Sequence, residues 1–192
     1  LVAYSGFSAA NYLEQPYNSD LDFGTGDFSV MGWFNHATST STQYMVVRTD
    51  GSTIPFSLGM TSTNQLLFAI LGGIPARSAV SAYADNTWNH VVFSRESGVA
   101  RVYLNGIFDD TVSSSETSDV SLSGAELYLG DSPISNAFAG SLALWRISAT
   151  APTAEQIAKI YEDEKLLFQE NAQATLYGAS DAVTALAHDP DT

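Results

Sequence analysis

The chain has 192 residues, of which 45% are hydrophobic and 11% aromatic, so it is long and apolar enough for one main domain with a sizeable core. Twenty-one acidic residues against seven basic ones give a formal charge of −14, which repels nucleic acid and anionic membrane surfaces. No apolar run approaches the roughly 20 residues that a membrane span needs, and the absence of cysteine excludes disulfides and thiolate metal sites. We therefore expect a globular domain that neither binds nucleic acid nor inserts into a membrane.

The first part of the chain predicts an extended segment, a loop and a long strand. Residues 1–17 set aromatic side chains among Ser, Ala and Asn, and the polar stretch 18–26 is typical of a loop. Phe28 to Phe34 alternates as a strand does, but Met31 and Trp33 make its second face apolar as well. We therefore expect this strand to be covered on both sides.

Short strands continue up to residue 83. Turn residues separate them about every 8 to 12 residues, which is typical of a sandwich or barrel and not of βαβ units. The segment Gly72-Gly73-Ile74-Pro75 interrupts the pattern. The expected strands are Tyr44–Arg48, Pro55–Met60, Gln65–Leu71 and Ser78–Tyr83.

A three-stranded meander follows. Trp88–Arg95 and Val99–Asn105 are rich in β-branched and aromatic residues, and the loop between them contains Gly98. Asn105-Gly106 most readily takes positive φ at both central positions of a turn, so a third strand should return through Ile107 and Phe108.

The end of the chain changes from strand to helix periodicity. After the expected strands Leu127–Leu129 and Ser141–Ile147, Pro152 precedes a capping box, Thr153-Ala-Glu-Gln156. Apolar residues then recur at helical spacing, which predicts a helix of about four turns within residues 151–171. Residues 172–192 remain as a tail or linker.

Four motifs occur in the order in which one known family has them. They are Gly26–Phe34, the hairpin from Trp88 to Gly106, Leu127–Gly130 and Phe138–Leu142. With them, residues 26–147 resemble the laminin-G-like (concanavalin A-like lectin/glucanase) domains. The resemblance implies an all-β fold, a two-sheet antiparallel jelly-roll β-sandwich over residues 1–150 with one C-terminal helix, in which the N-terminal segment pairs with the last strand.

The segments after the sandwich extend the resemblance. Asp181–Asp191 looks like the first strand and turn of a propeller-type repeat, and the combination of sandwich, helix and tail resembles architectures in phage tail and fibre proteins. This implies an extracellular or virion-surface protein that contacts other subunits, and a homo-oligomer is left open. The chain begins without methionine and stops at a turn signal, so we expect a piece of a longer protein.

Concanavalin A-like folds include glucanases, so the resemblance also allows a glycosidase. Retaining glycosidases need two carboxyl groups about 5 to 5.5 Å apart. The family motif E-x-D-x-E is absent, and Glu162-Asp163-Glu164 falls on the expected helix, where neighbouring side chains diverge. The sequence also lacks a nucleophile elbow, a phosphate loop and histidines spaced for zinc, and a structural role is favoured for His90. We therefore expect no enzymatic activity.

Calcium is the cofactor that the sequence favours. Asp109 and Asp110 follow the tight turn of the meander, and Asp131 follows the strand at Leu127–Gly130. Carboxylates in loops at strand ends are the ligands that this hard cation prefers, and the family resemblance implies one such ion at a loop edge. Solvated turn aspartates that bind no ion are the alternative, and the residues alone favour that alternative.

A sugar-binding site needs an aromatic surface beside planar polar side chains. The three tryptophans lie in expected strands, where a core role is favoured. Tyr44, Arg48, Arg77 and Tyr83 lie at strand ends or beside loops, and they are therefore the candidate ligand-binding residues.

These features together favour a non-catalytic binding or adhesion module for a glycan or a cell-surface receptor, in a protein such as a phage tail fibre. The first alternative is a structural or assembly module without a small ligand. The second is a glycoside hydrolase with an unfamiliar site. The fold alone does not decide, because one sandwich supports many functions.

Overall fold

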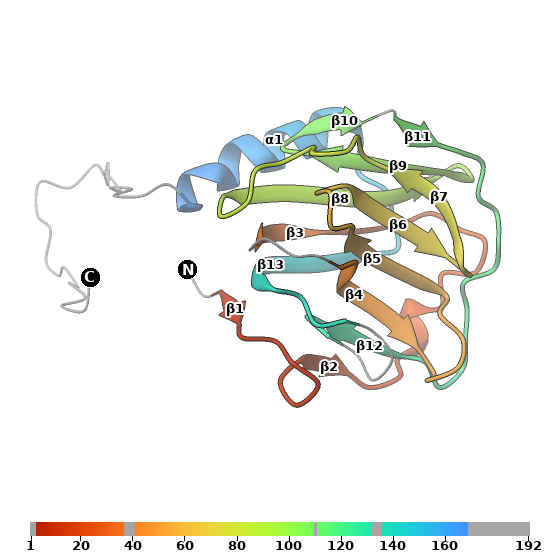
Figure 1. Cartoon of the computed structure of the whole chain (residues 1–192). Helices are drawn as coiled ribbons and strands as arrows, with labels where there is room; N and C mark the ends of the chain where they lie inside the picture. The colour runs from red at the N-terminus through yellow and green to blue at the C-terminus, as the bar shows by residue number, and fades with distance from the viewer. Residues whose placement is uncertain (1–2, 37–40, 110, 132–135, 169–192) are drawn as a thin grey trace, which may run out of the picture.

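The protein is a sandwich of two antiparallel β-sheets with one helix on its outside (Figure 1). The computed structural model describes residues 3–36, 41–109, 111–131 and 136–168. The six-stranded sheet has the order β1 (Tyr4–Ser5), β13 (Gly140–Ser148), β3 (Phe28–His36), β8 (Trp88–Glu96), β9 (Val99–Leu104) and β10 (Ile107–Asp109). The seven-stranded sheet has the order β11 (Val112–Ser113), β7 (Gly73–Arg77), β6 (Leu66–Ile70), β5 (Phe56–Met60), β4 (Gln43–Thr49), β12 (Glu126–Leu129) and β2 (Leu13–Gln15). The predicted jelly-roll fold is confirmed, including the pairing of β1 with β13.

The meander of β8, β9 and β10 forms because both of its turns contain residues that accept positive φ. Ser97 and Gly98 have φ of 50° and 70°, and Asn105 and Gly106 have φ of 51° and 81°. Positive φ at both central positions is the geometry of a tight type I′ hairpin turn, whose twist matches that of the strands it joins. Both predicted turns are therefore present.

The core lies between the sheets, and β3, in the middle of the six-stranded sheet, packs against it with one face. Phe28, Val30 and Phe34 belong to this core, whereas Met31 belongs to a second buried cluster on the other side of the sheet. Gly32 lies under the indole of Trp145, whose Cδ2 would be 2.5 Å from any Cβ at that position. Both faces of β3 are thus covered.

The helix α1 (Ala154–Glu164) and the 3₁₀ turn η2 (Lys165–Phe168) pack on the outer face of the six-stranded sheet. The predicted capping box is present, because the Gln156 amide donates to Thr153 Oγ1 at 3.3 Å and the Thr153 amide donates to Gln156 Oε1 at 2.8 Å. Ile157 packs against Met31, Val92 and Tyr103. No helix in the part of the chain that the structure describes has the length and apolar content needed to cross a membrane.

One predicted strand is wrong. Residues 78–83 form irregular structure, whereas Gly73–Arg77 is β7, which contains all but Gly72 of the segment expected to interrupt the pattern. Pro75 is tolerated because the register of β6 and β7 shifts between Phe68 and Ile70, and proline occurs in sheets at such irregularities. Ser81 has a φ of 56°, which a regular strand does not allow.

Candidate functional site

Two of the four predicted ligand-binding residues, Tyr44 and Arg77, lie on the outer face of the seven-stranded sheet. Tyr44 pairs with Gly59, Gly59 with Leu67, and Leu67 with Arg77, so the four residues form one row across β4, β5, β6 and β7. Their strand neighbours, such as Ala76, belong to the core, so the row faces outward. β4 and β7 are three strand spacings apart, so the Cα atoms of Tyr44 and Arg77 are separated by roughly 14 Å.

A small hollow lies on this row. Its volume is about 150 Å³, room for about five water molecules, so it suits one ring of a ligand better than a whole enclosed ligand. Most of its wall is apolar, and hydroxyl groups come from Tyr44 and Ser57. The lining residues are Tyr44, Ile54, Ser57, Leu67, Ala69, Gly72 and Ile74, none of them acidic.

The position of the Tyr44 ring depends on Gly59. A Cβ atom at Gly59 would overlap the carbonyl oxygen of Gln43 and would lie 3.0 Å from Cδ1 of Tyr44. The ring therefore lies against the bare backbone of β5. Tyr44 is partly exposed, and its hydroxyl makes no hydrogen bond with a described residue, so the hydroxyl is available to a ligand.

A second group of aromatic residues on this face was missed by sequence reasoning. Tyr128 pairs with Val47 of β4 and Glu14 of β2, and its ring lies edge-on to Tyr12 with centroids 5.5 Å apart. The Tyr128 hydroxyl donates a hydrogen bond to Glu126, and this bond, followed by burial, raises the pKa of Tyr128. The spacing of two residues from Glu126 to Tyr128 could have placed both on one face.

Arg48 lies inside the sandwich and does not line the hollow. It is fully buried, and its Nη1 donates to the carbonyl oxygens of Leu21 at 2.7 Å and Val120 at 2.9 Å. Its Nη2 bonds Asp22 Oδ1 at 2.5 Å, and this hydrogen bond lowers the pKa of Asp22. The guanidinium that we expected at the site thus fastens two loops to β4.

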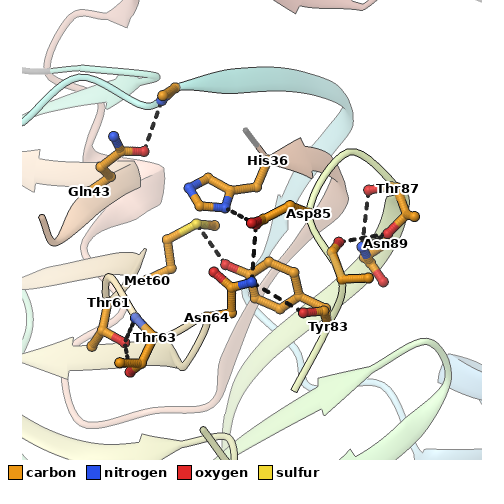
Figure 2. A network of polar contacts seen from close by, with 12 residues as sticks. His36, Gln43, Met60, Thr61, Thr63, Asn64, Tyr83, Asp85, Thr87 and Asn89 are labelled. Atoms are coloured by element: carbon orange, nitrogen blue, oxygen red, sulfur yellow. Dashed lines mark hydrogen bonds and ion pairs between the residues drawn. The ribbon is translucent and has the colours of Figure 1, made fainter. Parts of the chain in front are cut away.

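Tyr83 is also buried, in a polar network between β3 and the turn after β5 (Figure 2). Its hydroxyl donates to Met60 Sδ at 2.8 Å, and burial together with the charge of Asp85 raises the pKa of Tyr83. Asp85 Oδ1 accepts a hydrogen bond from Asn64 at 3.0 Å and lies 3.1 Å from His36 Nδ1. The network joins residues 83–85 to β3, and Tyr83 does not line the hollow.

The predicted calcium ligands are not brought together. Asp109 ends β10 at one edge of the sandwich, whereas Asp131 follows β12 on the far side (Figure 1). Burial raises the pKa of Asp109, but hydrogen bonds from Thr111 and the Ala79 amide outweigh it, so this pKa is lowered overall. The described residues contain no group of three His, Asp or Glu that fits an ion, and Asp110 lies outside them. Calcium binding stays a prediction.

Comparison with known families agrees with this architecture. A laminin G model, described as the concanavalin A-like lectin/glucanases superfamily, matches residues 7–158. The match covers more than half of the chain, and the chain therefore belongs to this superfamily. A comparison with curated proteins found no match.

Solved structures with this fold include a pentraxin, a domain of an enzyme and a neurotoxin. A heptameric SAP-like pentraxin from Limulus polyphemus is 15% identical with a TM-score of 0.54, over 70% of this chain and 69% of that one. Domain 4 of the extracellular arabinanase AbnA from Geobacillus stearothermophilus, in complex with arabinotriose, is 19% identical with a TM-score of 0.56, over 71% and 66%. Botulinum neurotoxin type C, whose cell entry depends on two ganglioside molecules, is 15% identical with a TM-score of 0.57, over 79% of this chain but 39% of that one.

Proposed function

We propose that this domain is a non-catalytic carbohydrate-binding module and that its glycan binds on the outer face of the seven-stranded sheet. The main support is the row from Tyr44 to Arg77 with a hollow on it, because it combines an aromatic ring, hydroxyl groups and a guanidinium. Sugars bind through apolar contact with aromatic rings and through a few well-placed polar groups. The helix packs on the other sheet, and no helix in the described part of the chain covers this face.

The class of ligand is also supported by the proteins that share the fold. One of them holds arabinotriose and another depends on gangliosides for cell entry. Their identity to this chain is 19% or less, so they support the fold and the choice of glycans as probes, while the particular sugar has to come from experiment.

The absence of catalysis is part of the proposal. No carboxyl group is among the lining residues of the hollow, whereas retaining glycosidases need two about 5 to 5.5 Å apart. Glu126 lies on the neighbouring strand β12, where it is bonded to Tyr128. We expect no release of reducing ends from any bound oligosaccharide.

We further propose that the module serves adhesion in an extracellular or virion-surface protein, such as a phage tail fibre, and that it acts in several copies. A shallow site of this size suits weak binding, and weak sites gain from presentation in several copies. The pentraxin that shares the fold is a heptamer, and the arabinanase is extracellular.

A glycan array tests the proposal. The wild-type protein should retain a defined set of glycans, and Tyr44→Ala should weaken that binding about tenfold, because one aromatic contact is lost. Tyr4→Ala is the matched control, since Tyr4 is an exposed tyrosine on β1 of the other sheet. Equal loss in both variants, or no retained glycan, would contradict the proposed site. A parallel array with a chelator tests the calcium prediction.

The alternative is an assembly module whose edges contact other subunits. Exposed apolar side chains favour it, namely Ile107 on the edge strand β10 and Leu166 and Leu167 on η2. This alternative predicts concentration-dependent association in light scattering together with an empty glycan array.

A further inference from the structure

Arg77 differs from every other cation of the chain. All seven basic residues lie in the described part, and five of them form ion pairs there, namely Arg48, Arg101, Arg146, Lys159 and Lys165. The sixth, Arg95, is buried and donates to the carbonyl oxygens of Gly24, Gly26 and Ser118. Arg77 has neither an ion pair nor a side-chain hydrogen bond with a described residue.

This difference is notable because acidic residues outnumber basic ones by 21 to seven. In such a chain most exposed guanidinium groups are expected to form an ion pair with a carboxylate, and Arg77 forms none with a described residue. Arg77 lies on the sheet face that also carries Tyr44 and the hollow. Its cross-strand neighbour Leu67 lines that hollow. The planar fork of a guanidinium matches the oxygens of a carboxylate or a sulfate and binds them through two parallel hydrogen bonds.

We infer that the glycan of the proposed site is an acidic one, whose carboxylate or sulfate group binds Arg77 while another of its sugar units lies at Tyr44. This inference rests on the proposed function and adds the ligand class. The roughly 14 Å between the two Cα atoms requires at least two sugar units, so a single monosaccharide does not reach both ends of the row.

The charge of the whole chain limits how strong this contact is. A net charge of −14 repels an anion at long range, so only the short-range contact with Arg77 favours the acidic ligand. Exposed charge pairs contribute little, and we expect a preference of about three- to tenfold for an acidic glycan over its neutral counterpart.

The experiment uses an array that presents each oligosaccharide in a neutral form, a form with a uronic or sialic acid, and a sulfated form. Arg77→Gln removes the charge, and Arg77→Lys keeps the charge but removes the fork. Arg101→Gln is the matched control, because Arg101 is a partly exposed cation on β9 of the other sheet. Circular dichroism melts show that each variant is folded.

The inference predicts that wild type prefers acidic glycans, that Arg77→Gln abolishes the preference while neutral glycans still bind, and that Arg101→Gln changes nothing. Arg77→Lys should keep only part of the preference. The carboxylated and sulfated arms then identify the anion. Equal binding of acidic and neutral forms by wild type, or an unchanged preference in Arg77→Gln, overturns the inference and leaves the proposed function standing. If wild type retains no glycan at all, both fail.

Discussion

Two buried arginines hold the loops at one end of the sandwich. Arg48 on β4 donates to the carbonyl oxygens of residues 21, 120 and 122, and Arg95 on β8 donates to those of residues 24, 26 and 118. One cation from each sheet thus fastens the same two segments, 21–26 and 118–122. Because burying a guanidinium without hydrogen-bond acceptors is costly, these contacts hold the loops in place, although Nε of Arg48 has no hydrogen-bond partner among the described residues.

Replacing Arg48 is therefore expected to be costly. Arg48→Met removes the ion-pair partner of Asp22 and the guanidinium donor of three carbonyl groups, and we expect a loss of about 3 to 5 kcal/mol of unfolding free energy in urea titrations. Arg101→Met, which removes a partly exposed pair with Glu96, should cost less than about 1 kcal/mol. A stable Arg48 variant with weakened glycan binding would instead restore Arg48 as a ligand residue.

His90 makes the stability depend on pH. The ring is fully buried between Trp33 and Tyr161, and neither ring nitrogen has a hydrogen-bond partner among the described residues. Burial lowers the pKa of His90 to about 4, with Glu164 opposing and Arg146 adding to the shift. The neutral ring is thus the folded form, while the unfolded chain binds a proton below pH 6.5.

The contribution of the neutral His90 ring to the unfolding free energy is therefore fully present above pH 6.5 and is lost as the pH falls toward 4. Between pH 7.5 and pH 5 we expect a loss of about 2 kcal/mol. Urea titrations at several pH values measure this slope, and His90→Leu should flatten it because leucine suits the apolar surroundings. An equal slope in both proteins would show that other groups cause it.

Burial of single residues was the hardest feature to predict from the sequence. Arg48 follows the core residue Val46 by two positions, so strand alternation alone could have placed it inside. The carbonyl groups that it bonds lie 27 and 72 residues away in the chain, so no local sequence pattern predicts these contacts. Tyr44 and Arg77 lie on the same row because β4, β5, β6 and β7 pair in chain order. The sequence predicts this row only if β7 is recognised as a strand.

At the scale of elements, turn chemistry and periodicity were the reliable signals. The meander and the helix were predictable because Asn105-Gly106 and the capping box from Thr153 to Gln156 determine the backbone conformation of their own segments. β7 was not, because Gly73 and Pro75 are poor strand residues, and their segment becomes a strand only when β6 and β11 pair with it. Tertiary pairing thus outweighed local preference.

The 3₁₀ turn η2 contributes to the packing of the helix on the sheet. The Phe168 ring lies 4.2 Å from that of Trp33 and 4.7 Å from that of Trp88, measured between centroids. Phe168→Ala should shift the tryptophan emission to longer wavelength and reduce the unfolding free energy by about 1 to 3 kcal/mol.

Leu167→Ala is the control in the same turn, since its side chain is 54% exposed. It should change the unfolding free energy by no more than about 0.5 kcal/mol and leave the emission unchanged. Similar effects of both substitutions would mean that the turn does not pack specifically on the tryptophans.

At the scale of the whole molecule, a small hollow on a strongly acidic protein predicts weak binding by one copy. Presentation of four biotinylated copies on streptavidin should raise the apparent affinity for a glycan-coated surface by about 10² to 10⁴, because later contacts form within one complex. Surface plasmon resonance with monomer and tetramer measures the ratio. A ratio near one would indicate that the copies cannot engage together.

Both lysines of the chain, Lys159 and Lys165, lie on α1 and η2, against the six-stranded sheet. Apart from the terminal amine, amine-reactive reagents therefore have targets on only one side of the molecule. A dye, a biotin or a chip surface coupled through lysine leaves Tyr44 and Arg77 pointing away from the attachment. The protein is thus already suited to oriented immobilisation, without an engineered tag.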